Sequence, residues 1–187
     1  MIRNDRGVFV KRILSIPILA FLVMGCASIS DFSRETYRKG FLTPDSFQNG
    51  TIGVLPLSGG EKTDRYLDKA REIVRKAIAE IEPRMRPLDL PLSKTKEVWS
   101  EQEFVPLKNT ARFLLQTELQ QVDLAEGATH VLIKGRLWDL EQGDILWEGV
   151  GESRGNLFLF FPMAPASFEK VLETASRGLI LKLPTRE

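Results

Sequence analysis

The stretch that decides the fold runs from Val131 to Arg154 and has the sequence VLIKGRLWDLEQGDILWEGVGESR. Apolar residues recur at odd positions on both sides of the polar segment 141–144, and alternation with a period of two is typical of half-buried strands. The stretch therefore predicts a β-hairpin. A three-residue loop at 141–143, with Gly143 in the left-handed conformation, keeps odd residues opposite odd residues. This register also places Arg136 opposite Glu148, a favourable cross-strand pair.

Outward from the hairpin, the chain alternates short apolar runs with amphipathic stripes. We expect a buried strand over 51–57, an edge strand at best over 85–92, and three helices, over 64–82, 107–125 and 165–183. Pro83 and Pro184 follow the first and third of these helices and end them. The order predicts an α/β fold, in which about three amphipathic helices pack on a single small mixed β-sheet.

The N-terminus has the pattern of an export signal. Basic residues precede an apolar run from Ile13 to Gly25, and Cys26, the only cysteine, follows directly. The run has 13 residues, which is short of the roughly 20 that span a bilayer. The segment Val23-Met24-Gly25-Cys26 resembles the lipobox of bacterial lipoproteins, in which the cysteine is acylated and becomes the first mature residue. The alternative for Cys26 is a buried structural cysteine.

These observations divide the chain into three parts. Residues 1–25 are expected to be a lipoprotein signal peptide, 26–50 a lipid anchor and flexible tether with at most a short helix over 31–38, and 51–187 a single periplasmic α/β domain. Ala27 follows the cysteine, where enteric lipoproteins that stay at the inner membrane have Asp. That resemblance favours an outer-membrane location facing the periplasm.

The charge of the chain argues against nucleic acid as a partner. The net charge is +1, and residues 1–25 contain four basic residues and one acidic residue, so the remaining chain has a net charge of −2. A nearly neutral domain lacks the basic patch that binds nucleic acid. Attachment to the membrane is therefore expected through acyl chains on Cys26, with no other cofactor.

No set of residues in the sequence forms a recognisable catalytic or metal site. His130 is the only histidine, so a Cys/His zinc site has too few ligands. Ser167 and Lys170 match a Ser-x-x-Lys pattern, as do Ser93 and Lys96, but the Ser-Asp-Asn and Lys-Thr-Gly elements of penicillin-interacting enzymes are missing. The segment 58–63 lacks the glycine spacing of a phosphate loop. We therefore expect no enzyme activity, with an enzyme acting on the cell wall or an exported substrate as the alternative.

One aromatic cluster is a candidate partner-binding patch. Residues 157–161 do not alternate between polar and apolar, so they cannot all face one core. An exposed apolar patch usually marks a partner or membrane surface, although burial as a closing strand or loop is also compatible with the sequence. The candidate patch consists of Leu157, Phe158, Phe160 and Phe161. Trp147 extends this patch if it is exposed, and the alternative for Trp147 is a position in the core or on a sheet face.

Three segments together resemble a group of bacterial envelope proteins. They are Ile52–Leu57, Ala128–Gly135 and Gly143–Glu148, followed by the last amphipathic helix. The group includes the curli secretion channel lipoprotein, the lipoprotein activators of penicillin-binding proteins and the N-terminal domain of TolB. The resemblance implies a TolB N-terminal-like sandwich that acts as a non-catalytic accessory or partner-binding module in an envelope assembly or transport complex. Its partner would be another envelope protein or further copies of itself.

Overall fold

The structure is a computed structural model that describes residues 28–50, 52–88, 104–125, 128–156 and 166–185. Eight strands form one mixed sheet, and two α-helices lie against it. The strands are β1 (Ser28–Asp31), β2 (Arg34–Arg38), β3 (Ile52–Val54), β4 (Ser58–Gly59), β5 (Arg86–Pro87), β6 (Phe113–Ala125), β7 (Ala128–Asp139) and β8 (Asp144–Asn156). The helices are α2 (Leu67–Ile81) and α4 (Phe168–Ile180), with 3-10 turns η1 (Pro44–Gly50), η2 (Glu61–Tyr66) and η3 (Val105–Leu107).

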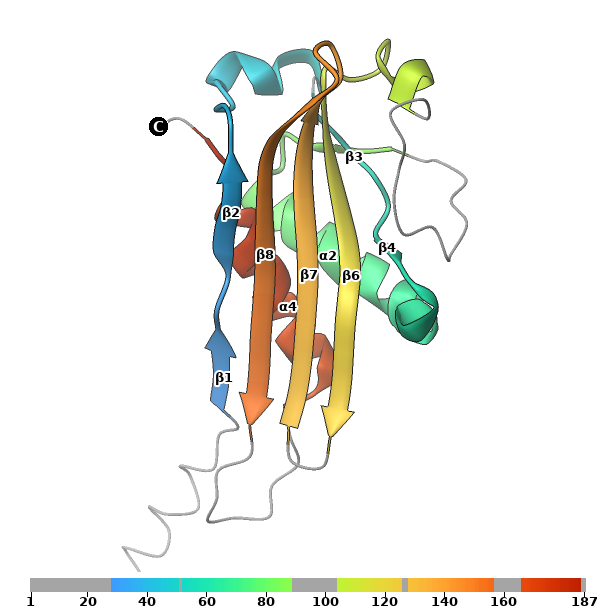
Figure 1. Cartoon of the computed structure of the whole chain (residues 1–187), viewed down its shortest axis with the longest axis vertical. Coiled ribbons are helices and arrows are strands. Elements are labelled where there is room, and N and C mark those ends of the chain that lie inside the picture. The colour runs from blue at the N-terminus through green and yellow to red at the C-terminus, as the bar shows by residue number, and fades with distance from the viewer. Residues whose placement is uncertain (1–27, 51, 89–103, 126–127, 157–165, 186–187) are drawn as a thin grey trace, which may run out of the picture.

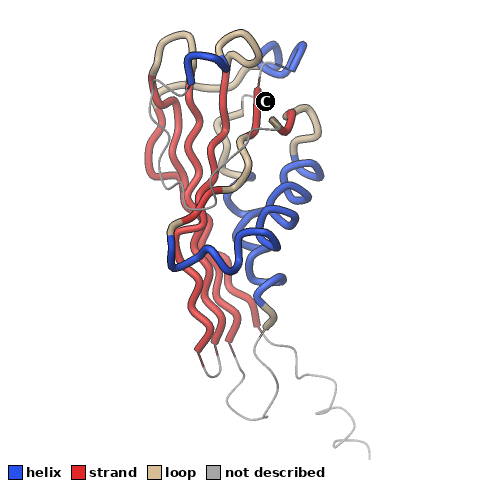
Figure 2. The backbone as a smooth tube through the Cα atoms, turned by 90° about the vertical axis from the view of Figure 1, so that its right-hand side faces the viewer, coloured by secondary structure: helices blue, strands red, loops and turns tan. Residues whose placement is uncertain are grey.

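The sheet is built around the three long strands β6, β7 and β8, which are antiparallel to one another (Figure 1). The strand order is β1-β8-β7-β6-β3-β5, with β2 continuing the β1 edge along β8 and β4 pairing with β6. The short strands β3, β4 and β5 join in parallel. Both helices cover the same face of this sheet, as Figure 2 shows. The result is a two-layer α/β molecule.

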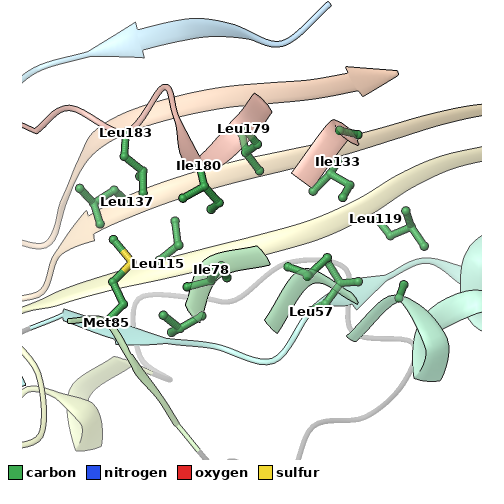
Figure 3. Close-up of a cluster of buried hydrophobic side chains, with 14 of the residues drawn as sticks. Leu57, Ile78, Met85, Leu115, Leu119, Ile133, Leu137, Leu179, Ile180 and Leu183 are labelled. Atoms are coloured by element: carbon green, nitrogen blue, oxygen red, sulfur yellow. The ribbon is translucent and has the colours of Figure 1, made fainter. Parts of the chain in front are cut away.

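The main core lies between the sheet and the two helices. Odd-numbered residues of β7, and of β6 up to the register shift between Leu119 and Gln121, point into it, and they meet the apolar stripes of α2 and α4. Figure 3 shows part of this cluster, with Leu115, Leu119, Ile133 and Leu137 facing the helices. A second, smaller cluster contains Leu55, Phe104, Leu107, Leu114 and Leu140. It includes Leu114, an even-numbered residue of β6, so β6 contributes to both clusters.

The predicted hairpin is confirmed, and its pairing differs in one detail. Leu137 pairs with Trp147 and Arg136 with Glu148, which is the predicted register. Gly143 has a φ of 74°, in the left-handed region that favours glycine. The connection, however, has four residues between the paired Asp139 and Asp144, and a register shift next to Leu137 restores the odd-to-odd pairing. The Asp139 carboxylate accepts hydrogen bonds from two backbone N–H groups of the turn.

The predicted helix over 107–125 is wrong, because Phe113–Ala125 forms strand β6. The first half of β6 is buried on both faces, where Leu115 faces the helices and Leu114 faces the second core cluster. A strand buried on both faces shows no clean alternation of polar and apolar residues. Its apolar residues can then fall at the three- and four-residue spacing of a helix.

The predicted flexible tether over 26–50 is also contradicted within the described part, residues 28–50. β1 and β2 pair with β8, and η1 follows them. The short helix considered over 31–38 is wrong for the same reason. Every residue of β2 is exposed, so this strand is held by backbone pairing at the sheet edge and carries no apolar alternation. The buried Leu42 and Phe47 join the main core.

The other predicted elements agree with the structure. α2 and α4 lie within the predicted helical ranges, β3 lies within the predicted first strand, and β5 is the edge strand. The predicted α/β fold of one mixed sheet packed by helices is confirmed, with two long helices over the described ranges in place of about three. Among the described residues, no helix has the length and hydrophobicity needed to cross a membrane.

Candidate functional site

The face of the sheet turned away from the helices carries a row of paired charges. Arg136 donates to Glu148 at 2.7 Å, Lys134 lies 3.0 Å from the same carboxylate, and Glu118 lies 3.9 Å from Arg136. These four side chains are 15–23% exposed. Burial raises the pKa of Glu148, but hydrogen bonds and charges from Arg136 and Lys134 outweigh it and hold the pKa below its ordinary value.

His130 lies further along this face, towards the end of the sheet at which β6 ends. Its Nε2 lies 3.1 Å from Glu152 Oε1, and its Nδ1 lies 3.6 Å from Asp123 Oδ2. Arg154 and Arg34 also contact Glu152, so the cluster contains both signs of charge. Among the interactions found in the described part, His130 contacts carboxylates and no serine. The arrangement is a cross-strand ion network, in which no described serine is aligned for attack.

An open cavity of about 360 Å³ lies between α2 and the segment 54–57. Its walls are largely apolar and include Leu57, Val74, Ile78 and Met85; Figure 3 shows Leu57, Ile78 and Met85 in this region. Arg71 reaches into the wall and donates from Nε to the Leu57 carbonyl at 3.0 Å. Its Nη2 is buried with no hydrogen-bond partner among the described residues.

The sequence-predicted site residues fall into two groups. Cys26 and the apolar residues Leu157, Phe158, Phe160 and Phe161 lie outside the described residues, so both predictions stay as they were. Trp147 is described and is fully buried in the main core. It therefore cannot belong to an exposed patch, and its inclusion there was wrong. Trp147 belongs to the odd-numbered, helix-facing residues of β8, which is the face the alternation assigns to the core.

Two of the segments weighed as catalytic patterns have structural roles, and the third, Ser93 to Lys96, lies outside the described residues. Ser167 is the N-cap of α4, where its Oγ accepts from the Lys170 backbone N–H at 3.3 Å. That spacing of three residues is the geometry of a helix cap. In the segment 58–63, Thr63 is buried and donates to the carbonyl of Gly60 at 2.9 Å. The segment forms the turn from β4 into η2.

Two surface features were missed from the sequence. The first is a set of three half-exposed aromatic residues in and next to β1 and β2, namely Phe32, Tyr37 and Phe41. The second is Leu124, which is 53% exposed near the end of β6. Both were missed because these segments were assigned to a tether and to a helix. The polar face of the sheet, which is turned away from the helices, could be recognised in the sequence, because polar and charged residues recur at even positions from His130 to Arg154.

Comparison with known proteins identifies similar folds only. No protein family and no curated protein matches the sequence. A PelC dodecamer structure from Paraburkholderia phytofirmans has a TM-score of 0.57 and 12% identity, and the match covers 84% of this chain and 100% of that one.

Two further solved structures are less similar. The LpoB C-terminal domain from Salmonella enterica has a TM-score of 0.39 at 15% identity, over 55% of this chain and 82% of that one. Lipoprotein GNA1162 from Neisseria meningitidis has a TM-score of 0.41 at 15% identity, and the match covers 66% of this chain and 92% of that one. Scores this low carry no argument about this chain. The PelC similarity shows that the two chains share a fold over the whole of the solved one.

Proposed function

We propose that this chain is a lipid-anchored protein of the bacterial cell envelope that acts as a non-catalytic accessory module and assembles with copies of itself. The anchor is an acylated Cys26, preceded by the signal peptide over 1–25. The outer membrane is the location that Ala27 favours. The folded part then faces the periplasm, and its partners are further copies and another envelope component.

The observation that carries the proposal is the combination of the lipobox with the fold. Val23–Cys26 has the order of residues that a lipoprotein signal requires. The two-layer fold that follows is similar to PelC over all of the solved chain, and that protein is a dodecamer. Since a fold alone does not determine function, self-association of this chain needs a direct measurement.

The anchor can be tested with two variants of the full chain expressed in a bacterium. Cys26→Ala is expected to abolish acylation and to leave the precursor uncleaved. The matched control, Ala27→Asp, keeps the cysteine, so it should still be lipidated but shift from the outer to the inner membrane where the enteric sorting rule operates. Cleavage and acylation are measured by mass spectrometry, and location by membrane fractionation. Normal processing of Cys26→Ala would refute the anchor.

Self-association can be tested on the lipidated protein extracted in mild detergent. The mass of the complex, measured by light scattering or native mass spectrometry, is expected to be several times that of one processed, lipidated chain, which lacks residues 1–25 of the 21.2 kDa precursor. A protein that stays monomeric at membrane concentrations would contradict the proposed assembly and leave the anchor unaffected.

A further inference from the structure

Among the described strands, two edges have no strand partner at the same end of the sheet. β6 pairs with β3 over 113–115 and with β4 over 118–119, and beyond that point its only strand partner in the described ranges is β7. On the opposite side, β1 pairs with β8, and no other described strand adjoins it. Figure 1 shows β1 and the end of β6 as the two outer margins of the same end of the molecule. Each presents a row of backbone groups, which is a template for pairing with another chain.

The directions of these two edges are compatible with each other. β1 is antiparallel to β8, β8 to β7, and β7 to β6. Four successive antiparallel strands leave the first and the last running in opposite directions. A second copy placed beside the first in the same orientation therefore brings its β1 antiparallel to the end of β6. The alternation continues across the boundary between copies without a break.

The side chains at the two edges also lie at matching levels. Ile29 pairs with Gly155, Gly155 with Thr129, and Thr129 with Leu124, so Ile29 and Leu124 occupy one row across the sheet. Ile29 packs on the main core, whereas Leu124 is 53% exposed. Pairing at this level puts Ile29 of one copy opposite Leu124 of the next, which removes exposed apolar surface from water.

The carboxylates at the two edges do not repel each other across the contact in this register. Asp31 lies in the row of Ser153, Val131 and Val122, and Asp123 lies in the row of His130 and Arg154. Neighbouring rows point to opposite faces of a sheet. The two edge carboxylates are therefore on opposite faces and not opposite each other. Like charges placed directly across a strand pair would have been unfavourable.

We propose that copies of this chain join by sheet extension, with β1 of one copy pairing with residues 120–125 of its neighbour. This names the contact for the self-association proposed above and rests on it. The two edges are different surfaces, so the contact is heterologous, and its repetition gives a closed ring or an open filament according to the rotation between copies. The occupant of each edge is a second copy, because the chain itself supplies the complementary strand at the matching level.

Engineered disulfides test the contact in the full, membrane-attached chain. Ile29→Cys and Leu124→Cys are introduced together. Three strand spacings of about 4.8 Å separate these positions within one molecule, which is about 14 Å. A disulfide needs Cα atoms about 4.5–7 Å apart, so this pair can close only between copies. Oxidation of the double variant is expected to give a ladder of covalent multimers on a non-reducing gel, with most of the protein in the multimer bands.

The controls separate this contact from random collision and from a change of register. Ile29→Cys with Leu181→Cys uses a residue that is 69% exposed, follows α4 and belongs to neither edge strand, and should give dimers at most. Asp31→Cys with Leu124→Cys tests a register shifted by two residues. One outcome overturns sheet extension: the complex is multimeric by mass, but neither the Ile29/Leu124 nor the Asp31/Leu124 cysteine pair gives more covalent multimers than the Leu181 control. A monomeric mass without any ladder would instead overturn self-association, and the contact with it.

Discussion

At the scale of single residues, Glu148 is the residue for which the structure most clearly predicts a pH-dependent contribution to folding stability. Its carboxylate is shared by Arg136 and Lys134 on the open face of the sheet. The pKa of Glu148 is lower in the folded chain than its ordinary value of 4.5, so the folded state favours the ionised form. The stability that follows from this shift is present above about pH 4.5 and is lost as the pH falls through the lower, folded-state pKa.

Glu148→Gln is therefore expected to lower the free energy of unfolding at pH 7 by about 1 kcal/mol, since the pair is partly exposed. The same variant should lose less stability than the parent chain between about pH 5 and pH 3. Denaturant unfolding at a series of pH values measures both effects. Glu72→Gln is the matched control, because its side chain is 70% exposed and lies 3.9 Å from Lys69. Parallel pH profiles for the parent and Glu148→Gln would contradict the assignment.

At the scale of elements, the packing of α4 on β8 depends on small residues. A Cβ added to Gly151 would lie 2.2 Å from the backbone carbonyl oxygen of Ala175 in α4. A Cβ on Gly149 would lie 2.4 Å from the Trp147 ring, which fills that space. The helix thus approaches the strand closely at Gly151, where β8 has no side chain, and Gly149 leaves room for the Trp147 ring.

Gly151→Ala is expected to destabilise the fold by about 1–3 kcal/mol, because a backbone atom of α4 must move to accommodate the methyl group. Thermal and denaturant unfolding measure the change. Gly40→Ala serves as the control, since its Cβ would meet only the end of the Leu146 side chain, at 3.1 Å. Equal stability of the two variants would show that α4 does not pack on β8 as closely as described.

The elements also show what the sequence could and could not predict. The β7–β8 hairpin was predictable with its register, because one face of it is buried and the other carries the polar side chains of His130, Lys134 and Arg136 at even positions. The start of β6 was not, because Leu114 and Leu115 are both fully buried on opposite faces. A period of two in the sequence arises when one face of a strand is apolar and the other is polar. Both faces are apolar at the start of β6, so the sequence shows no such period there.

The candidate site was predictable only in part, for a related reason. Trp147 follows the alternation that assigns it to the core, and the structure buries it. Leu124 and Ile29 take their significance from strand edges, which exist only once the order of the strands is known. Edge position is a property of topology, and pairing between distant segments leaves no local pattern in the sequence.

At the scale of the whole molecule, the domain begins earlier than its sequence suggests. Residues 28–50 have a polar composition typical of a tether, yet β1 and β2 cover the β8 edge and η1 follows. Leu42 is fully buried, and its backbone N–H donates to the Pro184 carbonyl at the other end of the chain. This segment therefore ties the two ends of the described chain together.

A chain that begins at residue 51 is expected not to fold, whereas one that begins at residue 28 should unfold cooperatively. The shorter chain loses Leu42 and Phe47 from the main core, and truncating a large buried apolar residue costs about 2–5 kcal/mol. It also loses every backbone hydrogen bond along the outer edge of β8. These losses together approach the whole free energy of unfolding of a typical domain, which is roughly 5–15 kcal/mol. Circular dichroism during heating compares the two chains. A transition in the shorter chain within a few degrees of the longer one would mean that residues 28–50 are an accessory to the domain and not part of it.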